Sequence, residues 1–149
     1  MDLLSLLNEN ARLTNAQLAV MLGKTEEEVE KEIADYQQKG IIKGYKALIN
    51  WEKVDHHKTT ALIELKVQPK KESGFDEIAK KIMQFSKVES VYLMSGGFDL
   101  AVMVHGDSIQ DIAMFVAKRL SPLDSVLSTA THFILTRYKE GDVILTSPK

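Results

Sequence analysis

The first 24 residues carry apolar side chains at the spacing of an α-helix. Leucines recur every three or four positions over residues 2–8, which predicts a first short helix. The stretch from Thr14 to Gln17 fits a capping box, in which the threonine hydroxyl accepts a backbone N–H and the glutamine reaches back to the cap. A second short helix therefore begins here, and Gly23 ends it, because glycine readily adopts a left-handed conformation.

A longer third helix is predicted over about residues 26–39. The stretch from Thr25 to Glu28 fits a second capping box, and Gly40 closes the helix. Its apolar positions are spaced four and three apart at Val29, Ile33 and Tyr36. Two helices joined by a turn that contains glycine are typical of a helix-turn-helix, and the second of them would be the recognition helix.

The next stretch leads out of this small domain. Residues 41–49, around Gly44, are predicted to form a strand, and the polar residues 51–58 are expected to form a linker. The sequence therefore predicts a helix-turn-helix domain over residues 1–50 and a second domain over residues 59–149.

The second domain alternates strand and helix patterns. Apolar positions at helical spacing predict one helix between Phe75 and Phe85 and another between Ile109 and Leu120. Apolar and polar positions alternate over four predicted strands, residues 61–67, 88–94, 98–104 and 126–138, the last of them long. The order β-α-β-β-α-β is that of the ferredoxin-like fold, an antiparallel sheet with two helices on one face. The predicted fold class is α+β, a winged helix-turn-helix followed by a ferredoxin-like domain.

One face of this sheet is left without helices, yet it is not polar. The residues expected there include Tyr92, Ala101, Met103 and Ile134. An apolar sheet face without cover usually marks an association surface. We therefore expect a homodimer that forms through the sheets.

Composition and charge limit the classes of function. The 149-residue chain has no cysteine, which excludes disulfides, thiol catalysis and cysteine-ligated zinc. It has no long apolar run and no basic leader, so we expect a cytoplasmic protein that does not contact a membrane. The net charge is −2. Residues 1–50 contain six Lys/Arg and eight Asp/Glu, so the predicted DNA-binding domain is itself slightly acidic.

Several polar side chains flank the predicted helix-turn-helix and are candidates for contacts with DNA phosphates. Four are lysines, and three are neutral residues at the starts of helices. The candidates are Thr14, Asn15, Lys24, Thr25, Lys31, Lys43 and Lys46. No spacing of the four histidines matches a metal site, and we expect no metal and no cofactor.

A helix-turn-helix followed by β-α-β-β-α-β resembles the leucine- and asparagine-responsive regulators of the Lrp/AsnC family. Leu3 to Arg12 is similar to the family's first helix, and Gln17 to Gly23 to its second. Gly40 to Tyr45 resembles its Gly-Val-Ile-x-Gly-Tyr link. Val91 to Leu100 resembles its Gly-x-Tyr-Asp-Leu loop, and Ser128 to Thr131 its Thr-x-Thr strand. The resemblance implies that the second domain forms dimers or higher oligomers and binds an amino acid near the loop.

A glycine-rich turn and two threonines are the candidate effector-binding residues. Exposed N–H groups in the turn can hold a carboxylate, and Asp99 can hold an ammonium, which are the two charged groups of an α-amino acid. The turn also fits a simple hairpin. The candidates are Ser95, Gly96, Gly97, Asp99, Thr129 and Thr131.

The predicted recognition helix departs from the family pattern. Members usually carry arginines just after the position of Val29, where this chain has Glu30-Lys31-Glu32. Pairs at i,i+4 spacing, Glu27 with Lys31 and Asp35 with Lys39, would neutralise some of the acids.

Three hypotheses follow for the function. The first is a DNA-binding transcriptional regulator whose second domain oligomerises and senses an amino acid or a similar small effector. The second is a ligand-binding oligomer that has lost DNA binding, because six acids lie in residues 25–39. The third is an enzyme like the haem-biosynthesis decarboxylases that resemble this family. Only Arg119 and Arg137 and four scattered histidines favour it, so we expect no enzyme.

Overall fold

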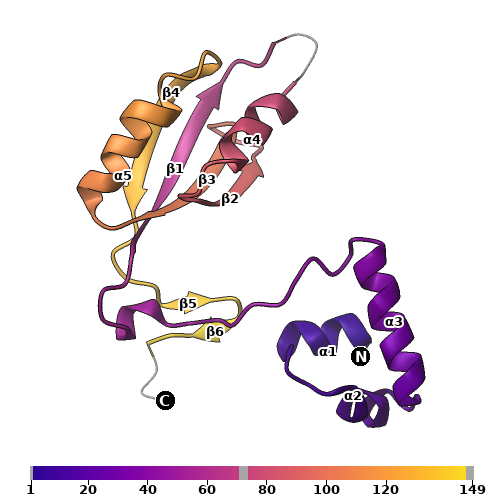
Figure 1. Ribbon diagram of the computed structural model, residues 1–149. Helices are drawn as coiled ribbons and strands as arrows, with labels where there is room; N and C mark the ends of the chain where they lie inside the picture. Colours follow the sequence, from indigo (N-terminus) through magenta and orange to yellow (C-terminus); the bar gives the residue numbers. More distant parts are fainter. Residues whose placement is uncertain (1, 71–73, 147–149) are drawn as a thin grey trace. The chain divides into compact units, whose positions relative to one another are not determined.

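The computed structural model describes residues 2–70 and 74–146. The chain folds as two compact units, Met1–Ile49 and Asn50–Lys149, and each has its own hydrophobic core (Figure 1). In the described ranges, none of the helices is both long and apolar enough to cross a lipid bilayer.

The first unit consists of three helices. They are α1 (Leu3–Glu9), α2 (Asn15–Leu22) and α3 (Glu26–Gln38). Leucines of α1, together with Leu18 and Val29, form a buried core, and Ile33 and Tyr36 pack against it. The apolar positions that predicted the helices are thus the positions that bury them.

The turn between α2 and α3 is fixed by Gly23. Its φ is 65°, in the left-handed region, and the next N–H, that of Lys24, donates to the carbonyl of Ala19. Glycine fits this position because the left-handed conformation is unfavourable for residues with a Cβ. The predicted start and end of α2 are therefore confirmed.

The strand expected over residues 41–49 is not present. The N–H groups of Ile41 and Ile42 both donate to the carbonyl of Tyr36 and close the end of α3, after which the backbone runs extended. Between residues 2 and 49, the structure has no strand. A single extended segment has no ladder partner, so the expected wing is absent from the described residues.

The second unit contains a four-stranded antiparallel sheet in the order β2-β3-β1-β4. Helices α4 and α5 cover the same face of this sheet (Figure 1). The chain order is β1 (Thr59–Val67), α4 (Asp76–Met83), β2 (Val88–Leu93), β3 (Leu100–Gly106), α5 (Ile109–Phe115) with its continuation η2 (Val116–Leu120), and β4 (Val126–Phe133). This is the β-α-β-β-α-β order that the sequence predicted.

The core lies between the sheet and the two helices. Alternate residues of β1 and β3 point into it, and Ile82 of α4 and Ile112 of α5 meet them there. The rings of Phe85 and Phe115 contact edge to face, with centroids 5.4 Å apart. Among residues 2–70 and 74–146, no helix covers the opposite face of the sheet.

The last strand is shorter than expected. It was predicted over residues 126–138, but β4 ends at Phe133, and the N–H of Ile134 makes one further bond to the carbonyl of Thr60. Because β1 begins at Thr59, β4 has no partner beyond this point. The chain then forms a small hairpin of β5 (Lys139–Glu140) and β6 (Val143–Ile144).

Residues 51–58, expected as a linker, lie within the second unit and are tied to this hairpin. They begin with the short helix η1 (Trp51–Lys53). The side chain of Asn50 donates to the carbonyl of Leu145 (3.0 Å), and the N–H of Arg137 donates to Glu52 Oε1 (3.2 Å). The polar composition of residues 51–58 suggested a linker. The bonds that tie this segment to the second unit could not be expected from it, because they join residues far apart in the sequence.

Candidate functional sites

The two threonines at the starts of α2 and α3 cap their helices. Thr14 Oγ1 accepts the N–H of Gln17 (3.1 Å), and Gln17 Oε1 accepts the N–H of Thr14 (2.9 Å), which completes the capping box. Thr25 Oγ1 accepts the N–H of Glu28 (3.1 Å). Asn15 is the exposed first residue of α2. These three residues therefore hold the beginnings of the two helices at the surface, where phosphate contacts are commonly made.

Lys24 is engaged in an ion pair inside the first unit. Its Nζ lies 2.6 Å from Glu32 Oε2, and the Tyr36 hydroxyl donates to the other carboxylate oxygen (3.1 Å). The hydrogen bond to Glu32 raises the pKa of Lys24, and the same bond lowers the pKa of Glu32. Lys24 thus fastens the turn to α3 through this ion pair.

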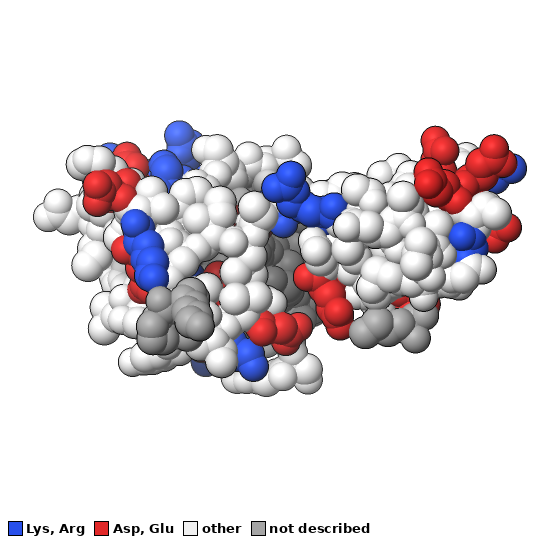
Figure 2. All heavy atoms as spheres, turned by 90° about the horizontal axis from the view of Figure 1, so that it is seen from below, with Lys and Arg blue, Asp and Glu red and all other residues white. Residues whose placement is uncertain are grey.

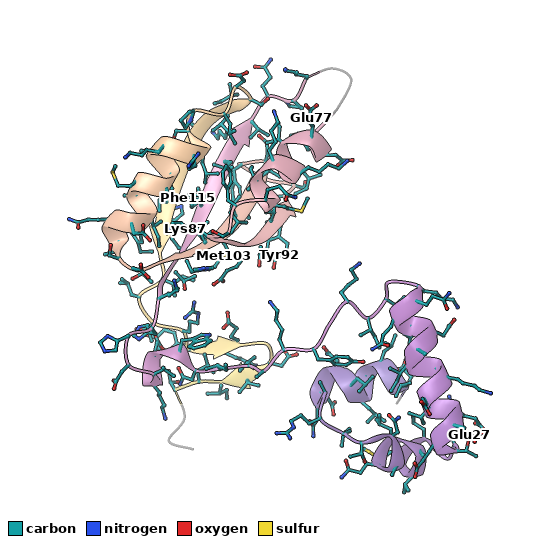
Figure 3. All side chains as sticks on the ribbon, in the orientation of Figure 1. Glu27, Glu77, Lys87, Tyr92, Met103 and Phe115 are labelled. Atoms are coloured by element: carbon teal, nitrogen blue, oxygen red, sulfur yellow. The ribbon has the colours of Figure 1, made fainter. Side chains whose placement is uncertain are left out.

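The outward stripe of α3 carries both signs of charge. Because residues three and four apart share a helix face, the side opposite buried Val29 carries Glu27, Lys31, Ala34 and Gln38. Figure 3 shows Glu27 on the side of α3 that faces away from α1 and α2. Lys31 and the other two lysine candidates, Lys43 and Lys46, are exposed.

The acids of α3 differ in their partners. Asp35 pairs with Lys39 (2.8 Å), as the i,i+4 spacing predicted, and Glu32 pairs with Lys24. Glu27 makes no ion pair with Lys31, although both belong to the described part of the chain. Acidic side chains gather on the surface of the first unit, at the right of Figure 2. Four glutamates therefore make no ion pair within 4 Å among the described residues, Glu26, Glu27, Glu28 and Glu30, although Glu28 lies close enough to Lys24 to raise the pKa of that lysine.

The turn between β2 and β3 is anchored to β1 by Asp99. Asp99 Oδ2 accepts the N–H of Val67 (2.9 Å), and its own N–H donates to the carbonyl of Leu65 (2.9 Å). The N–H of Met94 donates to the Asp99 carbonyl (2.8 Å) and closes the turn. Ser95, Gly96 and Gly97 between these anchors are exposed, and a Cβ at either glycine would meet no atom within 4 Å.

Thr129 lies near this turn, whereas Thr131 is farther from it. Thr129 is paired with Leu65 of β1, the residue whose carbonyl accepts the Asp99 N–H. Neighbouring strands lie about 4.8 Å apart, so the backbones of Thr129 and Asp99 are about 10 Å apart across β1. Thr131 is paired with Ile63, nearer the middle of the sheet. Both threonines share the helix-covered face with these core residues, because paired residues point to the same side.

The open face of the sheet carries an apolar surface and two histidines paired with glutamates, one of them His105, which lies in the row after Met103 and contacts Glu89. Ala101 lies between Tyr92 and Glu64, and Met103 lies between Ser90 and Leu62, in two adjacent rows across the strands. Tyr92 and Met103 are labelled in Figure 3. His132 Nε2 lies 3.0 Å from Glu64 Oε2 on the same face. Three of the residues expected on this face, Tyr92, Ala101 and Met103, are thus found there, whereas Ile134 lies just beyond the end of β4.

Relatives identify the family. Residues 60–144, more than half of the chain, match the Lrp/AsnC ligand binding domain. Over 147 residues the chain is 48% identical to the uncharacterized HTH-type transcriptional regulator YugG of Bacillus subtilis strain 168, covering 97% of this chain and 89% of that protein. The chain belongs to the Lrp/AsnC family.

Solved structures of Lrp/AsnC proteins have the same fold. AsnC of Escherichia coli superposes with a TM-score of 0.70 at 20% identity, covering 92% of this chain and 90% of that one. The complex of the transcriptional regulator NMB0573 from Neisseria meningitidis with L-methionine superposes with a TM-score of 0.72 at 22% identity, covering 91% and 86%.

The sequence reasoning missed the ion pair that fastens the recognition helix of this Lrp/AsnC protein. Lys24 and Glu32 are eight residues apart and on different sides of the turn. Helical i,i+4 spacing pointed instead to Glu27 and Lys31, which do not pair. A signal was present in Tyr36, because its hydroxyl also needs a partner on the same helix face.

Proposed function

We propose that this Lrp/AsnC protein is a cytoplasmic transcriptional regulator that binds double-stranded DNA through α2 and α3. Its second unit forms a homodimer or a higher homo-oligomer and binds a small effector, an amino acid or a close analogue. The protein acts without a cofactor and catalyses no reaction.

The main observation that supports DNA binding is the composition of the outward stripe of α3. The six acids of α3 argued against DNA binding, but two of them, Glu32 and Asp35, lie outside this stripe and form ion pairs with Lys24 and Lys39. The stripe itself has one glutamate and one lysine, and Gln38 can read a base edge. Lys43 and Lys46 add two positive charges just beyond the helix.

The effector proposal rests on the turn at residues 95–97 and on Asp99. The turn exposes backbone around two glycines, next to a carboxylate whose Oδ1 contacts no hydrogen-bond donor among the described residues. A carboxylate and an ammonium at the spacing of an α-amino acid fit such a pair of groups. The solved complex of the Neisseria relative with L-methionine supports this class of ligand.

The oligomer proposal rests on the open sheet face. Tyr92 is 54% exposed, and it lies in one row with Ala101, which is almost buried by its neighbours. A second copy of the same face would cover this surface with matching apolar side chains. Several helix-turn-helix units would then be available for one DNA molecule, which raises the effective affinity.

The test is an electrophoretic mobility shift on DNA from upstream of the protein's own gene. The full chain is titrated at about 50 mM and about 200 mM salt, with and without a pool of amino acids, against a scrambled duplex of the same length. A sequence-specific complex that weakens with salt, and whose affinity changes with amino acids, is the expected result. Equal binding to both duplexes would contradict it.

The second hypothesis, a ligand-binding oligomer without DNA binding, is favoured by one observation. Three glutamates in the first half of α3 have no cation partner among the described residues, Glu26, Glu27 and Glu30. They lie where a recognition helix usually approaches DNA and would repel its phosphates. The absence of any complex at low salt, with an oligomer that still binds an amino acid, would favour this hypothesis.

A further inference from the structure

A cavity of about 400 Å³ lies in the second unit, away from the turn at residues 95–97. Its walls come from η1 and the segment after it, from the start of β1, from the start of β2 and the end of β3, and from the segment between β4 and β5. Figure 1 shows η1 and the β5–β6 hairpin at this end of the sheet. A cavity of this volume is in the range of small-molecule sites.

Arg137 lines the cavity and is nearly buried. Only 16% of its side chain is exposed. One end of the guanidinium, Nη2, donates to Thr60 Oγ1 (2.6 Å). Within the described residues, its Nε is buried and has no hydrogen-bond partner. A buried donor on a charged group that lacks an acceptor is costly, so the Arg137 guanidinium is incompletely satisfied by the described residues.

The nearest carboxylate satisfies Arg137 only in part. Glu140 Oε2 lies 3.7 Å from Nε, which is an ion-pair distance but too long for a hydrogen bond, and the side chain of Glu140 is 54% exposed. A hydroxyl such as that of Thr60 accepts a proton but carries no charge. An oxyanion bound in the cavity, which Arg137 lines, would supply a further counter-charge to the guanidinium.

The remaining walls carry both polar and apolar side chains. His56, His57 and His105 line the cavity, and His105 is held by Glu89 (3.1 Å). Trp51 and Val54 supply apolar surface. Arginine with neighbouring imidazoles recognises carboxylate or phosphate groups, and the apolar wall suits an uncharged body.

We propose that this cavity binds a small organic oxyanion, a carboxylate or a phosphate ester with an apolar body, and that Arg137 is its anion-binding residue. The site is distinct from the turn that is proposed to bind the amino-acid effector, so the protein has a second ligand site. Anion binding in this cavity does not depend on DNA binding, so an experiment can contradict one proposal and leave the other standing.

The test is isothermal titration of the full chain with three ring compounds of similar size. Benzoate and phenyl phosphate carry the two oxyanions, and benzamide is the uncharged control for benzoate. We expect benzoate or phenyl phosphate to bind and benzamide not to bind. The relative affinity of the first two identifies the preferred oxyanion. Equal binding of benzamide, or no binding of either anion at millimolar concentration, would overturn the proposal.

Two variants of opposite expected sign separate binding from folding. Arg137→Gln should weaken binding of the preferred anion at least about tenfold, because it removes a charge-assisted hydrogen bond. Glu140→Gln should strengthen it severalfold, because the competing carboxylate is lost. A purely structural role for the Arg137–Glu140 pair predicts no strengthening by Glu140→Gln. Arg119→Gln, on exposed η2, is the matched control and should leave the affinity unchanged.

Discussion

Lys24 and Glu32 are joined by an ion pair of 2.6 Å across the turn between α2 and α3. The angle between the two helices is therefore held both by this ion pair and by the core around Val29. The ion pair also removes one acid of α3 from the surface that is proposed to face DNA. Lys24, proposed as a phosphate contact, is thus also a structural residue, and its replacement would change the turn as well as the charge.

Glu32→Gln should lower the stability of the first unit at neutral pH but not at acid pH. The pKa of Glu32 is lowered in the folded state, mainly by its bond to Lys24, so its stabilising effect is present above the ordinary glutamate pKa. The effect is lost as pH falls through the folded-state pKa. Thermal unfolding followed by far-UV circular dichroism should therefore show melting curves that differ at pH 7 and converge once the pH falls below the lowered folded-state pKa of Glu32. Glu30→Gln, which breaks no ion pair, is the control. The difference between its melting curve and that of the unchanged protein should not depend on pH in this way.

Lys31→Ala should weaken DNA binding by about the same factor on every sequence. Lys31 is the lysine of the outward stripe, and a phosphate contact carries no sequence information. The slope of log affinity against log salt should decrease by about 1. Lys118→Ala, which removes an exposed lysine of the second unit, is the control. An unchanged salt slope for Lys31→Ala would place α3 away from the phosphates.

Much of the fold was predictable because local rules decide it. The capping box at Thr14 and the glycine at Gly23 are satisfied within a few residues, so the bounds of α2 follow from the sequence. The order of strands and helices in the second unit followed from periodicity. The end of β4 at Phe133 did not, because it is set by where β1 begins, some 70 residues earlier, at Thr59.

The candidate sites were less predictable, because side-chain partners come from distant positions. Asp99 was proposed as an ammonium ligand, and one of its oxygens is already bonded to the N–H of Val67, 32 residues away. Thr131 was grouped with the turn by its sequence motif, but strand pairing places it opposite Ile63. Arg137 and Thr60 meet only because the segment after β4 passes the start of β1.

Gly23→Ala should lower the free energy of unfolding by about 1–2 kcal/mol, because an alanine resists a φ of 65°. A Cβ there would meet no atom within 4 Å, so the cost comes from the backbone alone. Gly44→Ala is a matched control, since a Cβ at Gly44 is equally uncrowded and its φ is not positive. The control should be neutral or slightly stabilising in chemical denaturation. Equal destabilisation by both would contradict this explanation.

Asp99→Asn and Asp99→Ala should separate the structural role of this residue from effector binding. The alanine leaves the buried N–H of Val67 without its acceptor, which should lower the free energy of unfolding by about 1–3 kcal/mol. The asparagine retains an acceptor oxygen and should keep most of the stability, but it loses the charge that is proposed to hold an ammonium. Titration with amino acids should therefore show weak binding for a stable Asp99→Asn protein. Unchanged binding would leave Asp99 a purely structural role.

Met103→Glu should convert the proposed dimer into a monomer. Met103 lies on the open sheet face between Ser90 and Leu62, so a carboxylate there would lose its hydration when the second copy covers this face. In the monomer the same side chain faces water, and the fold should be retained. Met114→Glu places the same charge on α5, where Met114 is 49% exposed on the helix side of the sheet, and should leave the oligomer unchanged. Light scattering after size-exclusion chromatography measures both masses, and circular dichroism confirms that both variants are folded. If Met114→Glu alone reduced the mass, the copies would associate through the helices, and the open face of the sheet would need another explanation.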